Sequence, residues 1–208
     1  ESYRGKAHVP EEIRQLKDQL ADQYLCNFSV FQSLLDHWAL DQLFPIMPIN
    51  KLKTAPECEG TLVDITCDSD GKVDKFIDFE DTSNTLPLHE IQVDESGHLK
   101  DKYYLGFFLM GAYQDIMGDL HNLFGKVNEA HVFLDEDEPS GYYIEEVIEG
   151  SNVGLALSSV QYDQRELKRH MKRQVDRAIK ADQIKPREGM RLLRDYDQGL
   201  SDYTYLSS

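Results

Sequence analysis

The chain has 208 residues, which is long enough to bury a proper core as one or two domains. It carries 22 basic and 38 acidic residues, and the net charge of −16 excludes general binding to nucleic acid or to anionic membranes. Three cysteines without metal-ligand spacing, no bilayer-length apolar stretch and no signal-peptide core predict free thiols and a cytoplasmic location.

The first 50 residues predict a helical segment. Val9, Ile13, Leu16, Leu20 and Tyr24 recur at helical spacing, and charged residues occupy the other face. An amphipathic helix of this kind needs a partner surface. The following stretch, 27–49, is apolar and irregular and is interpreted as a buried crossing segment.

Residues 51–150 predict a β-domain, because short apolar runs alternate with turn-forming clusters. The expected strands cover residues 60–67, 73–79, 103–113, 131–134 and 142–148. Turn clusters at 68–71 and 135–141 separate them. The acidic run at 135–138 is interpreted as a solvated hairpin tip.

Residues 151–208 predict a helical domain. After a short segment at 153–160, Asp163 with Glu166 three residues later indicates a capping-box-like helix start. A last helix is expected to begin at Pro186 and to end near Gly199. Helical, then β, then helical segments in this order predict an α+β fold, mostly antiparallel in its sheet, rather than alternating βαβ units.

The segment Ile65-Thr66-Cys67-Asp68-Ser69-Asp70-Gly71 is the first candidate functional site. A thiol beside two carboxylates follows an apolar run at a glycine-containing turn, where a sheet presents reactive groups at its rim. A thiol exchanges a proton near neutrality, and carboxylates suit a cationic substrate. Taken alone, Cys67 is more often a small buried hydrophobe, and Asp68 and Asp70 are more often turn formers.

A second candidate segment runs from Gly111-Ala112-Tyr113 to Asp119-Leu120-His121-Asn122-Leu123-Phe124. It is expected to close an apolar strand over 104–110 and to leave the Tyr113 phenol at the tip. An ordinary amphipathic tyrosine at the edge of a core is the alternative interpretation.

These two segments, with Asn27-Phe28-Ser29, Trp38-Ala39 and Tyr203-Thr204-Tyr205-Leu206, resemble the fold III pyridoxal-phosphate decarboxylases of basic amino acids. More narrowly, they are similar to the biosynthetic arginine decarboxylases of bacteria, over nearly the whole chain. The resemblance implies the C-terminal third of such an enzyme, with a β-domain of the alanine-racemase and ornithine-decarboxylase type. It implies conversion of L-arginine into agmatine and carbon dioxide in polyamine and spermidine biosynthesis.

The same resemblance implies partners and cofactors. Neither a Schiff-base lysine nor a glycine-rich phosphate site is identifiable in this sequence, so an N-terminal α/β barrel is expected to supply both. The family's members are homo-oligomers whose active sites lie at subunit interfaces. Magnesium is associated with the bacterial arginine enzymes, although no magnesium site can be assigned here.

Residue roles also follow from the resemblance. Cys67 corresponds to the general acid that reprotonates the α-carbon after carbon dioxide leaves, and Asp68 to the carboxylate that binds the guanidinium. Asp70 is a weaker candidate for the same contact. The Tyr113 hydroxyl and the Gly111 backbone are expected at the cofactor phosphate. His121 stands where ornithine-specific relatives place an aromatic that lines the substrate pocket.

Two other functions remain open from the residues. One is a non-catalytic, decarboxylase-like module that pairs with an active enzyme and regulates it, and the other is decarboxylation of a different basic amino acid. The basic segment over 163–180 could be a nucleic-acid helix, but a solvated face that pairs with acidic residues, within or between subunits, is the favoured interpretation.

Overall fold

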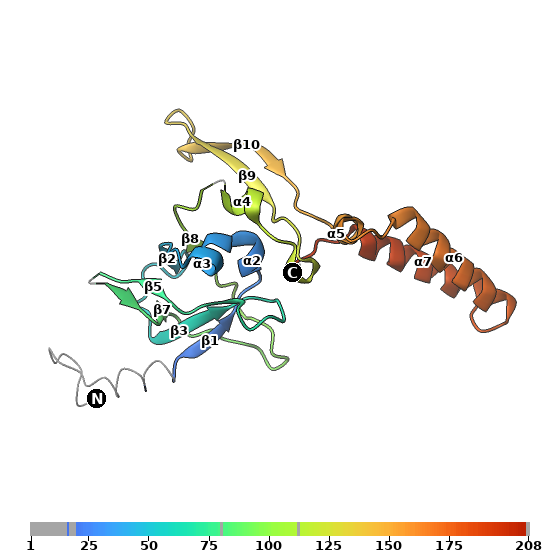
Figure 1. Cartoon of the computed structure of the whole chain (residues 1–208), viewed down its shortest axis with the longest axis horizontal. Helices are drawn as coiled ribbons and strands as arrows, with labels where there is room; N and C mark the ends of the chain where they lie inside the picture. Colours follow the sequence, from blue (N-terminus) through green and yellow to red (C-terminus); the bar gives the residue numbers. More distant parts are fainter. Residues whose placement is uncertain (1–15, 17–19, 80, 112, 207–208) are drawn as a thin grey trace. The chain divides into compact units, whose positions relative to one another are not determined.

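The computed structural model describes residues 16, 20–79, 81–111 and 113–206 (Figure 1). These residues form two compact units, which are described separately. The first contains the described residues up to Val30 and Leu34–Ile116, and the second contains Phe31–Ser33 and the described residues from Met117 onward.

The first unit is built around strand β3 (Cys58–Val63), which has partners on both sides. Strand β1 (Asp22–Leu25) pairs with β3 in parallel. Strands β4 (Lys72–Val73) and β7 (Leu86–Leu88) pair with it antiparallel, β4 beside its C-terminal end and β7 beside its N-terminal end. Two further antiparallel pairs join β2 (Ile46–Pro48) to β8 (Leu105–Phe107) and β5 (Phe76–Ile77) to β6 (Thr82–Ser83).

The core of this unit lies on one face of the sheet. Leu62 is fully buried and lies opposite Tyr24 on β1 and Val73 on β4. Gly60 allows the Tyr24 ring to pass close to the strand, because a Cβ at this position would lie 2.7 Å from that ring. Buried residues from the short helices, the loops and strands β5 and β7 complete the cluster: Val30, Leu34, Phe44, Phe76, Leu86 and Leu88.

Three short helices accompany the sheet: α2 (Val30–Ser33), α3 (Leu35–Leu40) and α4 (Tyr113–Met117). Helices α2 and α3 replace part of the irregular crossing segment expected at 27–49. That segment is buried at Val30, Leu34 and Phe44, as expected, but Trp38 and Leu40 on α3 are exposed.

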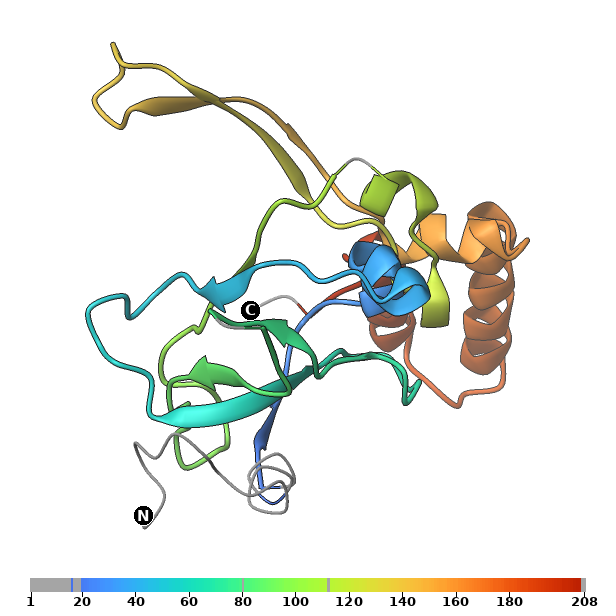
Figure 2. The same ribbon diagram turned by 60° about the vertical axis from the view of Figure 1, so that its left-hand side comes forward.

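The second unit consists of a β-hairpin and a helical part. Strands β9 (Glu129–Leu134) and β10 (Tyr142–Ile148) form the hairpin, which Figure 2 shows as an extended two-stranded ribbon. The 3₁₀ turn η1 (His121–Leu123) precedes it. The helices are α5 (Val153–Ser159), α6 (Gln164–Lys180) and α7 (Pro186–Ser201).

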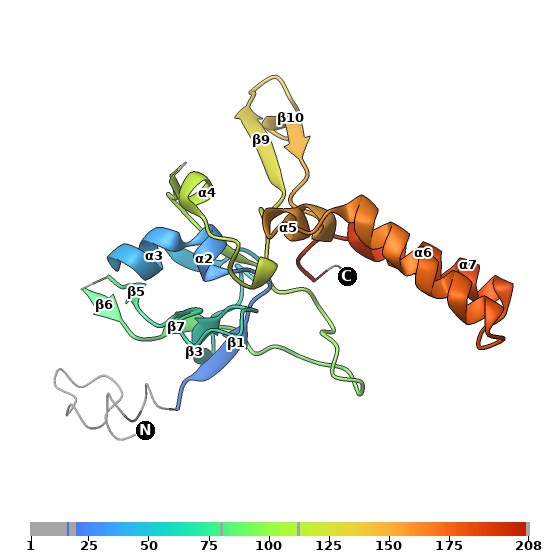
Figure 3. The same ribbon diagram turned by 45° about the vertical axis from the view of Figure 1, so that its right-hand side comes forward.

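Helices α6 and α7 lie side by side (Figure 3). Their close approach depends on Gly189, because a Cβ there would lie 2.8 Å from the side chains of Val175 and Ile179. Val175 is buried at this contact, as expected for the apolar face of α6. The predicted cap is confirmed, since the Asp163 side chain accepts the Glu166 N–H at 2.9 Å.

The α+β fold class with mostly antiparallel strands is confirmed, but several local expectations are wrong. The strand expected over 60–67 ends at Val63, and the one expected over 73–79 is divided between β4 and β5. Tyr24 lies in β1 and not in a helix, because its backbone pairs with β3; Val9 and Ile13 lie outside the described residues. The strand expected over 103–113 covers only Leu105–Phe107. Helix α7 continues through Gly199 to Ser201, with Leu200 buried in its last turn.

Candidate functional site

The segment that carries Cys67 connects β3 to β4. Cys67, Asp68 and Asp70 are all exposed there, whereas Gly71 at the end of the turn is buried. The position at the rim of the sheet agrees with the sequence-based prediction. The thiol and both carboxylates are therefore accessible from solvent.

Backbone hydrogen bonds give this turn a defined conformation. The Asp70 N–H donates to Asp68 Oδ1 at 2.9 Å, and the Gly71 N–H donates to the Asp68 carbonyl at 3.0 Å. Aspartate favours turns through this kind of side-chain to backbone bond. The Trp38 indole N–H also donates to Asp70 Oδ2 at 3.3 Å. Asp68 and Asp70 thus lie together in one ordered turn, and Asp68 has a turn-forming role whatever else it does.

Asp64 is a buried residue that supports the turn through hydrogen bonds. It is 4% exposed, and its Oδ1 accepts the Thr66 N–H at 2.8 Å and the Thr66 hydroxyl at 2.7 Å. Its Oδ2 accepts the Val30 N–H at 2.8 Å. A Cβ on Gly71 would lie 2.2 Å from Asp64 Oδ1, so only glycine allows this approach. Sequence reasoning missed Asp64; a lone acid between the apolar Val63 and Ile65 was the available signal.

Gly111 and Tyr113 lie at the start of α4 and not at a strand tip. The Gln114 N–H donates to the Gly111 carbonyl at 3.2 Å. Tyr113 is 70% exposed, and a Cβ on Gly111 would meet no atom within 4 Å. Ala112 between them lies outside the described residues. The phenol therefore reaches solvent as expected, but a helix and not a strand presents it.

His121 belongs to the second unit, whereas the other predicted site residues belong to the first. It begins η1, is partly buried, and its ring centroid lies 4.3 Å from that of Phe31 in the same unit. This contact positions an imidazole ring against an aromatic ring.

A different environment surrounds Cys26, the cysteine before the crossing segment. Burial raises the pKa of its thiol to about 11, and the thiol donates to the Tyr24 carbonyl at 3.4 Å. Elsewhere in this unit, the hydrogen bond from Lys75 lowers the pKa of Asp41. Cys67, unlike Cys26, lies on the surface.

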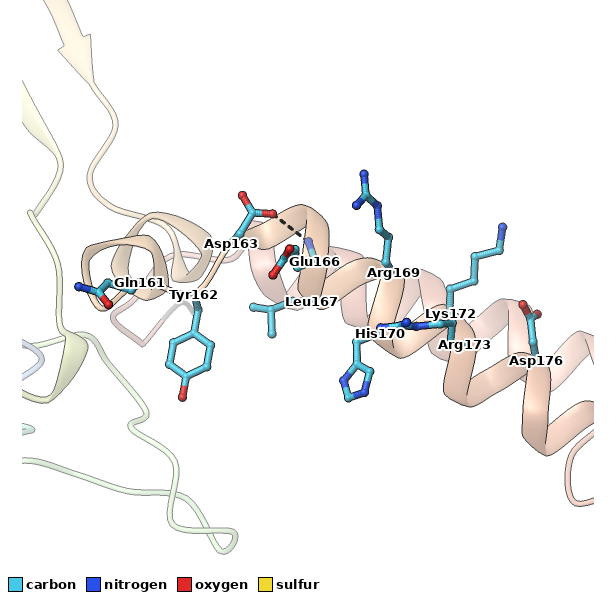
Figure 4. Close-up of a pocket in the computed structure, with 10 residues that line it drawn as sticks. All are labelled: Gln161, Tyr162, Asp163, Glu166, Leu167, Arg169, His170, Lys172, Arg173 and Asp176. Atoms are coloured by element: carbon cyan, nitrogen blue, oxygen red, sulfur yellow. Dashed lines mark hydrogen bonds between the residues drawn. The ribbon is translucent and has the colours of Figure 1, made fainter.

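A shallow pocket of about 730 Å³ lies on the second unit along α6 (Figure 4). Tyr162, Leu167 and His170 line it together with cations of that helix, and none of the predicted site residues does. In the described part of the chain, no three His, Cys, Asp or Glu residues are grouped so that they could hold a metal ion. No helix among the described residues has the length and apolarity to cross a membrane.

Comparison with known proteins matches the chain to decarboxylases. Residues 153–206 match the family described as the arginine decarboxylase C-terminal helical extension. The biosynthetic arginine decarboxylases of Gloeobacter violaceus and Phocaeicola vulgatus are 46% and 48% identical over 97% of this chain. The crystal structure of the biosynthetic arginine decarboxylase SpeA from Campylobacter jejuni has a TM-score of 0.73 at 35% identity, over 89% of this chain.

These matches cover only part of each relative, because the chain spans 31% of the length of the first two proteins and 29% of the solved one. The α+β fold, with its C-terminal helices, is thus similar to one region of these longer proteins. The resemblance to biosynthetic arginine decarboxylases that was inferred from the motifs is confirmed over nearly the whole chain.

Proposed function

We propose that this chain is the C-terminal part of a pyridoxal-phosphate-dependent arginine decarboxylase, which converts L-arginine into agmatine and carbon dioxide for polyamine biosynthesis in the cytoplasm. The observation that carries the proposal is 46% identity to a biosynthetic arginine decarboxylase over 97% of the chain. The accessible thiol and carboxylates of the turn between β3 and β4 support it, since they are suited to proton transfer and to binding a cation.

The residues at the start of α4 fit the phosphate end of the cofactor. The Tyr113 hydroxyl is exposed and can donate a hydrogen bond, and the open space beside Gly111 lets a phosphate approach the backbone. When bound, pyridoxal phosphate supplies the electron sink for loss of carbon dioxide. The lysine that anchors it is expected in an N-terminal barrel. The resemblance also implies magnesium, for which the described residues offer no cluster of ligands.

Cys67 is proposed as the general acid of the reaction. Its thiol lies at the surface of a hydrogen-bonded turn, where the barrel of a partner subunit can bring the substrate against it. The thiol donates its proton to the substrate's α-carbon once carbon dioxide has left. A thiol is one of the side-chain groups that can act as a general acid.

Asp68 is proposed to bind the guanidinium of L-arginine. A carboxylate can accept two parallel N–H bonds from that group, and the turn holds the Asp68 side chain in place through the Asp70 N–H. Asp70 contacts Trp38 and is the next candidate, followed by His121 on the second unit. The complete enzyme is proposed to be a homo-oligomer with this turn at a subunit interface.

Replacing Cys67 in the complete enzyme tests its role. Cys67→Ala should leave cofactor binding intact, because the side chain is exposed and the change removes only the thiol. Without the proton donor, turnover should divert from agmatine toward transamination. The measurement is the ratio of agmatine to transamination product. Unchanged turnover with agmatine as the sole product would remove Cys67 from the mechanism.

Replacing Asp68 tests substrate recognition. Asp68→Asn keeps the side-chain volume and an oxygen that can accept the Asp70 N–H, but it removes the negative charge. The loss of a charge-assisted pair, about 2 kcal/mol, should lower kcat/KM for arginine roughly 30-fold or more. Asp94→Asn, at an exposed loop of the same unit, is the matched control. If kcat/KM for arginine barely moved with the fold retained, Asp68 would be only a turn former.

A further inference from the structure

The turn that begins with His121 has a strained backbone. Asn122 and Leu123 both lie in the left-handed region, with φ of 54° and 63°. Asparagine tolerates this region, but a side chain as large as that of leucine adopts it only when the surrounding structure imposes it. Strain of this kind persists only where other contacts over-determine the conformation. The contacts on either side of η1 are therefore what holds His121 in its place.

On its N-terminal side the turn is held by α2. The Asp119 N–H donates to the Phe31 carbonyl at 3.0 Å, and the ring centroids of Phe31 and His121 lie 4.3 Å apart. Phe31 is 3% exposed, so its ring is a fixed surface for the imidazole. The imidazole position thus depends on this ring contact and on the backbone of the turn.

On its C-terminal side the turn is held by two residues that follow α7. The Gly125 N–H donates to Thr204 Oγ1 at 3.0 Å, and the Gly125 carbonyl accepts the Tyr205 hydroxyl at 2.7 Å. Tyr205 is buried, and its ring centroid lies 5.4 Å from that of Phe124. The Phe124 N–H in turn donates to the His121 carbonyl at 3.2 Å. The two side chains thus fix the backbone that leaves η1.

Close packing around Gly125 reinforces these hydrogen bonds. A Cβ at this position would collide with the Cβ of Ser151. The Ser151 hydroxyl accepts the Lys126 N–H at 3.0 Å, and the Ser151 N–H donates to the Lys126 carbonyl at 2.9 Å. The Thr204 N–H donates to the Ser151 carbonyl at 3.3 Å. Three chain segments are therefore interlocked next to the turn.

The helical extension (residues 153–206) carries both residues that bond to the glycine, and its two ends meet. The Val153 N–H donates to the Asp202 carbonyl at 2.9 Å, and Asn152 forms a β-bridge with Tyr203. Helices α6 and α7 thus lead away from α5 and return to it (Figure 3). The residues after α7 reach η1 because this helical excursion closes on itself.

We propose that the helical extension supports the active site through a clasp, Thr204 and Tyr205, two positioning residues that hold the strained turn and set the place of His121. The inference rests on the proposed function, in which His121 is a candidate for substrate contact. The extension then contributes to substrate recognition although Thr204 and Tyr205 act only through another residue.

The position of the strain favours this role over simple packing. Strained residues cluster at active sites and ligand clamps, and the two left-handed residues directly follow His121. The Thr204 and Tyr205 hydroxyls both bond to the backbone of Gly125. The clasp therefore acts on the path of the chain that carries the imidazole.

The first experiment observes the His121 imidazole by NMR in the 208-residue chain, where the stacked aromatic ring displaces its proton resonances. Tyr205→Phe removes the hydroxyl of the clasp and keeps the ring, and Thr204→Val removes the other hydroxyl. Each should move the His121 resonances toward those of a histidine in a short peptide. Tyr162→Phe, at an exposed tyrosine of the same unit, is the matched control and should leave them in place. Unmoved resonances in both clasp variants overturn the proposal.

The second experiment measures kinetics of the complete enzyme. Tyr205→Phe should raise KM for arginine about threefold to tenfold with kcat nearly unchanged, because a misplaced His121 weakens ground-state and transition-state binding alike. This change should disappear in a His121→Ala background, since residues that act through one another are not additive. An equal rise in KM in both backgrounds, or a fall in kcat alone, overturns the positioning role. Thr204→Val carries the same test if Tyr205→Phe fails to fold.

The outcomes separate the clasp from the proposed function. A complete enzyme that formed no agmatine from arginine would contradict the proposed function, and the His121 resonances would still decide whether the clasp holds the turn. If agmatine formed but His121→Ala left KM for arginine unchanged, the proposed reaction would stand and the role of the clasp in substrate recognition would be overturned.

Discussion

At the scale of single residues, Asp64 and Cys67 show how one short segment combines support and exposure. Asp64 is buried and accepts three hydrogen bonds from Val30 and Thr66. Cys67, three residues later, lies on the surface. A buried carboxylate is stable only when its oxygens are satisfied, so the backbone around it is held in one conformation. The accessible side chains of the turn are therefore positioned by a residue that does not itself reach the solvent.

Replacing Asp64 should destabilise the first unit. In Asp64→Asn an amide nitrogen replaces one oxygen and faces a backbone or hydroxyl donor, so at least one buried hydrogen bond is lost. We expect the free energy of unfolding to fall by about 2 to 3 kcal/mol in urea titrations. Asp68→Asn, in the exposed part of the turn, should cost less than about 1 kcal/mol. Equal costs for the two variants would contradict the supporting role of Asp64.

The cysteines should differ in reactivity. With a pKa of about 11, Cys26 has roughly one thiolate in a thousand at pH 8, because its surroundings are apolar and disfavour the charged form. Iodoacetamide at pH 8 should therefore modify Cys67 at least about tenfold faster than Cys26, as measured by peptide mass spectrometry. Modification of Cys26 should accelerate as the pH rises toward 11, and in urea the difference should vanish. Fast labelling of Cys26 in the folded chain would show that it is not buried.

At the scale of elements, some helix ends are determined by local hydrogen bonds and others by tertiary packing. The start of α6 is determined locally, since Asp163 caps it within its own turn. The end of α7 is not determined by Gly199, because Leu200 is buried beyond it and holds the last turn in place. Tertiary packing outweighed the tendency of glycine to end a helix.

Removing the N-terminal cap of α6 should lower stability through that helix alone. Asp163→Ala leaves the Glu166 N–H without its side-chain acceptor, and we expect a loss of about 1 kcal/mol in the free energy of unfolding. Amide hydrogen exchange should accelerate in the first turn of α6. Asp176→Ala, at an exposed position inside the same helix, is the control and should change stability by less than about 0.5 kcal/mol. If Asp176→Ala lowered the free energy of unfolding more than Asp163→Ala, the loss would be due to surface charge and not to the cap.

At the scale of the whole molecule, the chain corresponds to about a third of each relative, and the proposed active site combines it with residues outside it. The predicted site residues within the chain are divided between its two units, with His121 on the second. The proposed function places this site between subunits. It can be tested by mixing two inactive forms of the complete enzyme.

Mixed dimers should recover activity. Asp68→Asn subunits are combined with subunits that lack the cofactor-anchoring lysine of the barrel. Each mixed dimer then has one site with both groups intact, provided that the turn of one subunit serves the barrel of the other. Statistical exchange should restore about a quarter of wild-type activity. No recovery, despite subunit exchange proven by mass spectrometry, would mean that Asp68 serves the barrel of its own chain.

The sequence by itself determined the features that depend on neighbouring residues. The α+β order, the α6 cap at Asp163, the start of α7 at Pro186 and the hairpin of β9 and β10 follow from side-chain periodicity and local hydrogen bonding. The turn around Cys67 was predicted at the rim of the sheet for the same reason, because its residues bond mainly to one another. The resemblance to arginine decarboxylases also followed from short motifs.

Only the tertiary structure decided the features that depend on distant partners. Tyr24 fits a helical pattern, but pairing with β3, far along the chain, makes it part of a strand. Asp64 became a support for the turn only because Val30 comes next to it, and a sequence pattern does not reveal such a contact. Which residues of the hairpin share a face likewise depends on the register across the bulge at 144–146. Long-range pairing and register are set by the whole packed chain, whereas caps and turns are set by a few successive residues.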